Sequence, residues 1–141
     1  MTPLQKAERL HQNVNTFILT CVGVDGYPLT KAVVPGKHRK SLKELYFCTN
    51  TSSNFVSAIK DNPKASVYFY SRKLFKWQGC FLKGDMKIVT DMGIKEMYWQ
   101  EKYKDAYEEK SFTDVDFCVL KFTPTVGRFY SNFTLADFEI K

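Results

Sequence analysis

The residues best suited to bind a ligand form a run of hydroxyl and amide side chains at positions 49–54, TNTSSN, between an apolar stretch and a helix-forming one. Ser52 or Ser53 is placed to cap the helix that follows. Unpaired N–H groups and the dipole of a helix N-terminus attract anions, so this turn is a candidate anion site. The same residues also suit an ordinary capped connection, and spacing alone favours that simpler interpretation.

Residues that catalysis usually needs are scarce elsewhere. The chain has two histidines, His11 in an expected helix and His38 in the basic stretch at residues 37–40, so we assemble neither a metal site nor a nucleophile triad from them. The seven glycines are scattered and form no phosphate loop. Catalytic residues stay unassigned, and any redox chemistry is expected to come from a bound cofactor.

Composition narrows the class of protein. The chain has 141 residues, enough for one domain spanning residues 1–141, and its 16% aromatic content favours strands. The formal charge of +6 suits anionic partners, whether nucleic acid, membrane or a phosphorylated cofactor. Four cysteines in apolar runs predict free thiols, and the polar N-terminus predicts neither a signal peptide nor a membrane segment. We therefore expect a cytoplasmic protein that does not associate with membranes.

The residue pattern predicts a mainly β fold with helices. We expect strands at residues 17–24, 27–34, 45–49, 65–70, 81–89 and 115–122 and a pair of short ones within 129–140, with helices at 2–13, from Ser52 or Ser53 to Asn62, and at 92–103. At least six strands with such spacing suggest a split antiparallel β-barrel flanked by short helices. Residues 115–122 are apolar on both faces, which predicts two covering layers.

Short motifs spread over residues 17–140 resemble the pyridoxamine 5'-phosphate oxidase-like family, and more narrowly its short members called general stress protein-like. The motifs, in chain order, are Tyr27-Pro28 with Lys31, LYFCTNTSS at residues 45–53, Asn62-Pro63, Tyr68-Phe69-Tyr70, Gln78-Gly79, Gly84-Asp85-Met86, Val119-Leu120-Lys121-Phe122 and Arg128-Phe129-Tyr130. The resemblance implies a homodimer of split barrels that binds flavin mononucleotide, FMN, in two clefts at the subunit interface.

The resemblance also implies which residues contact the cofactor. Residues 31–34 would run along the flavin ring, residues 47–49 would line the cleft, and residues 52–54 with the Thr49 hydroxyl would hold the phosphate. A glutamine and a glycine would lie beside the flavin, and a tryptophan would reach it from the partner subunit. The implied set is Lys31, Ala32, Val33, Val34, Phe47, Cys48, Thr49, Ser52, Ser53, Asn54, Gln78, Gly79 and Trp99.

Two departures from the family pattern matter. Asn54 and Phe55 stand where many flavin-binding relatives place Arg or Lys, which removes a charge-assisted contact worth about 1.5–3 kcal/mol. Either FMN binds more weakly here, or Lys31 and Arg39 compensate. The chain also lacks the longer C-terminal region that completes the substrate site of true pyridoxamine phosphate oxidases, so we do not expect vitamin B6 oxidation.

Three functions remain open. The first is a homodimeric FMN-dependent oxidoreductase of an unknown small substrate, and the second is a non-catalytic binder or carrier of FMN, haem or another planar anion. The third, a nucleic-acid-binding barrel, is least favoured because the aromatic residues lie among apolar neighbours and should be buried. The two-sided stretch at 115–122 favours a dimer, since its second apolar face needs a cover.

Overall fold

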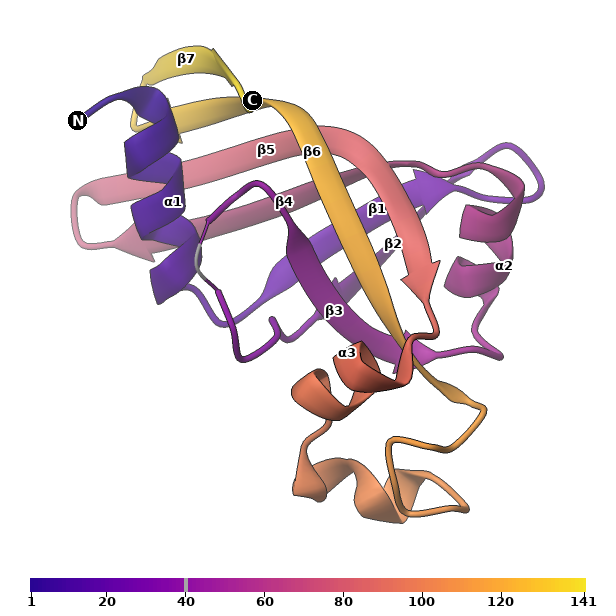
Figure 1. The fold of residues 1–141 in the computed structure, drawn as a ribbon. Helices are drawn as coiled ribbons and strands as arrows, with labels where there is room; N and C mark the ends of the chain where they lie inside the picture. Colours follow the sequence, from indigo (N-terminus) through magenta and orange to yellow (C-terminus); the bar gives the residue numbers. More distant parts are fainter. Residues whose placement is uncertain (40) are drawn as a thin grey trace.

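One curved antiparallel sheet of seven strands forms the body of the molecule (Figure 1). The computed structural model describes residues 1–39 and 41–141, so Lys40 of the basic stretch lies outside it. The strands are β1 (Phe17–Val22), β2 (Pro28–Val33), β3 (Leu45–Asn50), β4 (Lys64–Lys73), β5 (Lys76–Val89), β6 (Phe117–Ser131) and β7 (Thr134–Glu139). The helices are α1 (Pro3–Asn13), α2 (Asn54–Asp61), α3 (Met92–Tyr98) and the 3₁₀ helix η1 (Glu101–Ala106). The expected mainly β fold with short helices is confirmed.

The order of the strands leaves the barrel open along one line. The sheet runs β2-β1-β4-β5-β6-β3, and β7 pairs with β6. β2 and β3 are therefore the two ends of the path, and no ladder joins them among the residues that the structure describes. We call the line where these two strands face each other the seam. It is the split of the predicted split barrel.

The main core fills the concave side of the sheet. Inward-facing residues alternate with outward-facing ones along the strands, as Leu82 and Met86 (buried) and Lys83 and Lys87 (exposed) show on β5. This confirms the predicted alternation at residues 81–89. Helices α1 and α2 lie at opposite ends of the sheet and contribute buried apolar residues to the same core (Figure 1). The buried helix residues are Ala7, Leu10, Phe55, Val56, Ala58 and Ile59.

A second, smaller apolar cluster covers the other face of β6. Trp99 and Tyr98 pack with Phe117 and Val119, so α3 and the segment after it lie over the first half of this strand. The prediction that residues 115–122 are covered on both faces is confirmed for the part inside β6, although Val115 itself is exposed. The second cover comes from the same chain, however. This strand therefore does not itself require a partner subunit, and the argument from it for a dimer is wrong.

Several predicted boundaries are also wrong. β4 continues to Lys73 rather than ending at 70, and β5 begins at Lys76 rather than at 81, because the two strands pair up to the turn between them. The helix expected at 92–103 ends at Tyr98, because Trp99 takes extended backbone angles before η1 begins. The strand expected to end at 122 continues to Ser131, so most of one expected short strand belongs to β6. A bulge at Thr125, opposite Lys83 and Gly84, lets Pro124 lie inside the strand.

Candidate functional site

A hydrogen bond between side chains crosses the seam. The Lys31 ammonium on β2 donates to the Thr49 hydroxyl on β3, with 2.8 Å between Nζ and Oγ1. Both residues occupy inward-facing positions of their strands, Lys31 between Leu29 and Val33, and Thr49 after Phe47. Two residues that the family resemblance assigns to the cofactor, Lys31 along the ring and Thr49 at the phosphate, are thus brought together, although 18 positions separate them in the chain.

Lys31 is a partly buried cation with no acidic partner. Its ammonium lies 4.9 Å from the centroid of the Phe55 ring, and among the described residues it takes part in neither ion pair, which are Lys121–Glu44 and Arg128–Asp137. Burial lowers the pKa of Lys31 from its ordinary value. A charge that has lost water without gaining a counterion favours an incoming anion.

A cavity of about 280 Å³ opens at the seam, beside this bond. We call it the seam pocket. Four of its lining residues belong to the implied cofactor set, namely Val33, Val34, Cys48 and Thr49; the others are Asn50, Tyr103 and Tyr107. Because β2 pairs only with β1 among the described strands, alternate backbone N–H and C=O groups on its outer edge are free for a ligand.

Two tyrosines form an aromatic wall of the seam pocket that sequence reasoning missed. Tyr103 lies in η1 and Tyr107 directly follows it, and the Tyr107 hydroxyl donates to the amide oxygen of Asn50 on β3. Burial raises the pKa of both hydroxyls to about 12, so both stay protonated at neutral pH. Their placement depends on the docking of residues 99–117 against β3, which no local pattern reveals.

Trp99 supports this wall from behind within its own chain. Its ring stands edge-on to Phe117 at 5.0 Å between centroids and lies 5.7 Å from both Tyr103 and Tyr107. The side chain is 9% exposed, and its indole N–H donates to Glu101. A contact of Trp99 with a partner's cofactor stays a prediction.

Cys48 lines the seam pocket as a protonated thiol, not as a reactive thiolate. Its Sγ lies 3.6 Å from the Tyr98 carbonyl oxygen, to which it donates, and burial raises the pKa of Cys48 to about 11. The thiolate that would attack a substrate is therefore scarce at neutral pH. All four cysteines are free, as the sequence predicts; Cys48 is partly exposed, and Cys21, Cys80 and Cys118 are buried.

The turn before α2 behaves as a helix cap and is already partly occupied. The Ser53 hydroxyl accepts the N–H of Val56 at 3.2 Å, which confirms Ser53 as the N-cap. The carboxylate of Asp116 accepts the N–H of Ser52 at 2.8 Å, and its backbone carbonyl accepts the N–H of Thr51 at 2.7 Å. An anion supplied by the chain itself thus stands at this turn.

Other members of the implied set lie away from the seam pocket. Phe47 is buried in the main core against Phe17, and Ala32 faces outward on β2. Gln78 and Gly79 are on β5, which β4 and β1 separate from β2. A Cβ at Gly79 would lie 2.6 Å from the Tyr68 hydroxyl, so this glycine makes room for a side chain of its own subunit. Their contacts with a cofactor stay predictions.

The Arg39 guanidinium is engaged elsewhere. It donates to the backbone carbonyls of His11 and Val14 at 2.8 and 2.6 Å, at the end of α1. Nη1 of Arg39 thus already serves the end of α1, which argues against the alternative that Arg39 replaces the missing basic residue at the turn. Lys31 remains as a cation at the seam, and Lys37, whose ammonium donates to the Trp99 carbonyl at 3.4 Å, adds a positive charge near Cys48.

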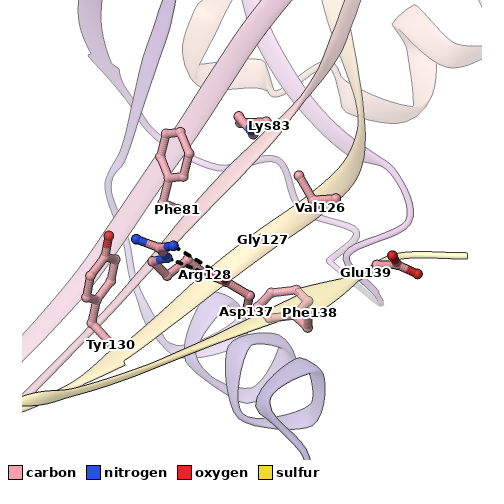
Figure 2. Close-up of a pocket in the computed structure, with 9 residues that line it drawn as sticks. All are labelled: Phe81, Lys83, Val126, Gly127, Arg128, Tyr130, Asp137, Phe138 and Glu139. Atoms are coloured by element: carbon pink, nitrogen blue, oxygen red, sulfur yellow. Dashed lines mark hydrogen bonds and ion pairs between the residues drawn. The ribbon is translucent and has the colours of Figure 1, made fainter.

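A larger hollow of about 790 Å³ lies on the outer face of β5, β6 and β7 (Figure 2). Arg128 is its central charge, and Figure 2 shows its guanidinium turned toward Asp137, to which it donates two hydrogen bonds of 2.6 and 3.2 Å. The Phe81 and Tyr130 rings flank it. Arg128 and Asp137 neutralise each other there, whereas Lys31, which bonds to the Thr49 hydroxyl at the edge of the seam pocket, has no acidic partner among the described residues; we therefore take the seam pocket as the candidate ligand site.

Neither a metal cluster nor a membrane span is found in the described part of the chain. No group of three or more His, Cys, Asp or Glu side chains lies close enough to hold a metal ion there. No helix within residues 1–39 and 41–141 is long and apolar enough to cross a membrane.

An antiparallel sheet that is open along one seam, with an aromatic-walled pocket beside that seam, defines a split barrel. The chain belongs to the pyridoxamine 5'-phosphate oxidase family, whose model matches residues 4–131. This confirms the resemblance drawn from the motifs. A comparison with curated protein sequences finds no match.

Solved structures agree with this assignment. A protein related to general stress protein 26 from Clostridium acetobutylicum, of the pyridoxinephosphate oxidase family, is 30% identical with a TM-score of 0.82, over 99% of this chain and 97% of that one. An FMN-binding, pyridoxamine 5'-phosphate oxidase-related protein from Nostoc punctiforme is 14% identical with a TM-score of 0.72, over 100% and 98%. A heme-binding protein from Mycobacterium smegmatis is 12% identical with a TM-score of 0.78, over 99% and 58%. The last two share the fold alone.

Proposed function

We propose that the protein is a homodimeric FMN-binding oxidoreductase of a small substrate, with the flavin ring in the seam pocket. The observation that carries this proposal is the meeting of three features in one place. They are the free edge of β2, the Lys31–Thr49 bond across the seam, and the tyrosine wall. The FMN-binding relative of the same fold supports the choice of ligand.

The chemistry of the pocket suits a flavin ring. A flat ring with a polar edge needs aromatic or apolar faces and a row of donors and acceptors, which Tyr103, Tyr107 and the backbone at Val33 and Val34 offer. When bound, FMN supplies hydride or electron transfer. The chain's own residues orient the ring, shield it from water, and place the Lys31 charge beside it.

The same residues suit the FMN phosphate less well. Lys31, Thr49 and the Ser53 hydroxyl are at hand, and the N–H groups of Asn54 and Phe55 make no hydrogen bond to another described residue. The Asp116 carboxylate, however, occupies the neighbouring N–H of Ser52. We therefore place the phosphate near α2 only as part of this proposal.

The outer face of the sheet supports a homodimer. Outward positions of β4, β5 and β6 carry partly exposed aromatic rings, two of which, Phe81 and Tyr130, line the hollow of Figure 2. The rings are those of Tyr68, Tyr70, Trp77, Phe81 and Tyr130. Rings gathered on one face of a sheet are typical of a surface that a second molecule covers. We propose this face as a dimer contact; a cofactor at the subunit interface stays an implication of the family resemblance.

A non-catalytic carrier of FMN, haem or another planar anion is the second candidate. It is favoured by the protonation of the groups that line the seam pocket. The Cys48 thiol and the Tyr103 and Tyr107 hydroxyls all have a raised pKa and hold their protons at neutral pH, so none is a ready general base. As part of the proposal we place the protein in the cytoplasm, where its four free thiols would stay reduced.

Titration of the purified protein with FMN, followed by flavin absorbance and fluorescence, tests this function. We expect saturable binding with one flavin per chain. Lys31→Met should weaken binding about tenfold or more, because it removes a charge-assisted contact, whereas Lys60→Met on the exposed side of α2 should not. Anaerobic addition of NADH or NADPH then separates an oxidoreductase from a carrier. Absence of FMN uptake at high micromolar concentration would contradict both the FMN-dependent oxidoreductase and the FMN carrier.

A further inference from the structure

The turn that leads into α2 holds an anion of the chain itself. The Asp116 carboxylate accepts the Ser52 N–H, and the Asp116 carbonyl accepts the Thr51 N–H. The Thr51 hydroxyl donates to the Val115 carbonyl at 2.9 Å. The segment that precedes β6 is therefore fastened along the turn, with its carboxylate beside the first residues of the helix.

Further hydrogen bonds fix Asp116 in this position. Its own N–H donates to Oδ1 of Asp114 at 2.8 Å, while Oδ2 of Asp114 accepts the N–H of Glu109 at 2.9 Å. The buried Lys95 ammonium donates to the Asp114 carbonyl at 3.0 Å. Asp116 thus belongs to a bonded framework and is not a freely rotating surface acid.

The charges around the turn leave little attraction for a second anion. Lys31 donates to Thr49 across the seam, and the Lys95 ammonium is engaged with the Asp114 carbonyl. Positions 54 and 55 carry the uncharged Asn54 and Phe55. A phosphate placed at this turn would gain one lysine but would lie close to a fixed carboxylate, and like charges a few ångströms apart repel strongly.

We propose that Asp116 is a specificity-determining residue that offsets the affinity usually gained from a terminal phosphate. The seam pocket then binds flavins through the ring and the sugar-like chain, and it scarcely distinguishes FMN from riboflavin. This inference rests on the proposed function, because it requires a flavin in the seam pocket. It adds that the pocket does not select for the phosphate of the flavin, and that Asp116 is the residue responsible.

Fluorescence titrations with FMN and with riboflavin test this inference in three proteins: the wild type, Asp116→Asn and Asp61→Asn. The asparagine at 116 keeps an oxygen to accept the Ser52 N–H, and Asp61 provides the same charge change at the opposite end of α2. In the wild type we expect the two affinities to agree within about threefold. Asp116→Asn should raise FMN affinity about tenfold and change riboflavin affinity less than about twofold. Asp61→Asn should change neither.

The salt dependence of FMN binding provides a second readout of the same charge effect. Added salt should weaken FMN binding by Asp116→Asn, whose net attraction for phosphate is exposed to screening, and should leave wild-type FMN binding nearly unchanged. FMN binding at least about a hundredfold tighter than riboflavin binding in the wild type would overturn the inference. Equal effects of Asp116→Asn on both flavins would also overturn it. If neither flavin binds any of the three proteins, the proposed function fails, and this inference fails with it.

Discussion

Lys31 and Thr49 connect the two edges of the barrel, and no other described side-chain bond joins β2 to β3. Lys31 holds its charge in a partly buried place with an aromatic ring on one side and a hydroxyl on the other. Such a lysine costs folding free energy unless an anion approaches it. Under the proposed function, an anion that binds at the seam would relieve this cost by pairing with the Lys31 ammonium.

Substitutions at Thr49, Ser53 and Arg39 should distinguish effects on FMN binding from effects on the stability of the fold. We predict that Thr49→Ala and Ser53→Ala each weaken FMN binding more than Arg39→Ala does, because Arg39 bonds to the end of α1. Arg39→Ala should instead lower the free energy of unfolding by about 1–3 kcal/mol, since it leaves two carbonyls without a donor. Equilibrium binding and urea unfolding of the three variants measure both quantities. A larger loss of FMN binding in Arg39→Ala would show that the phosphate does not lie at the turn before α2.

His11 makes stability depend on pH. Its ring is buried between Phe17 and Phe69, Nδ1 lies 2.9 Å from the Glu8 carbonyl, and burial lowers the pKa of His11 from 6.5. Below pH 6.5 the unfolded chain takes up a proton at this residue and the folded chain does not. The free energy of unfolding should therefore fall as pH drops below about 6.5, by at most about 1.4 kcal/mol per pH unit.

Urea unfolding between pH 7 and 5 measures this slope. His11→Asn should lose this contribution to the slope, while the exposed His38→Asn should keep it. Equal slopes in the wild type and in His11→Asn would show that the buried imidazole is not the titrating group.

Among the elements, η1 and the residue after it provide the two tyrosines that form the wall of the seam pocket. This segment and α3 pack against β6. Phe117 is the contact between them, with Trp99, Tyr103 and Tyr107 all within 6.2 Å between ring centroids. Because Phe117 belongs to the smaller cluster, its loss should act on this wall more than on the main core. The position of the tyrosines thus depends on packing at a strand rather than on helix propensity.

We predict that Phe117→Ala lowers the free energy of unfolding by about 3–5 kcal/mol, the usual effect of removing a fully buried ring. Phe133→Ala, at a fully exposed turn, should change it by less than about 0.5 kcal/mol. Denaturant unfolding of both variants decides the matter. Similar small effects would mean that the second cluster contributes little to the fold.

Local signals predicted the elements well and the site in part. The Ser53 cap, the alternation on β5 and the helix end before Pro63 were readable because each depends on neighbours in sequence. Lys31 and Thr49 were assigned through the family resemblance. Tyr107 and Asp116 were missed because they reach the site from about 57 and 64 positions further along the chain. Only tertiary docking places them there.

At the scale of the whole molecule, the proposed dimer contact is the outer face of the sheet. Phe81 lies in the hollow of Figure 2 and also borders the neighbouring hollow toward β1. We predict that the wild type elutes with twice the mass of the chain and that Phe81→Lys elutes as a monomer, because a charge there would have to be desolvated. Tyr27→Lys, at the exposed β1–β2 turn, should stay dimeric. Size-exclusion chromatography with light scattering measures the masses, and a monomeric wild type would contradict the dimer.

Hydrogen exchange with and without FMN tests the central proposal most directly. If the flavin lies along the seam, saturating FMN should slow exchange of backbone amides in peptides covering β2, β3 and residues 101–107, where Val33, Thr49 and Tyr103 lie. Peptides from the β1–β2 turn should be unchanged. Bound FMN with no slowing along β2 and β3, or with protection confined to the β4–β5 end around Gln78, would contradict a flavin site at the seam.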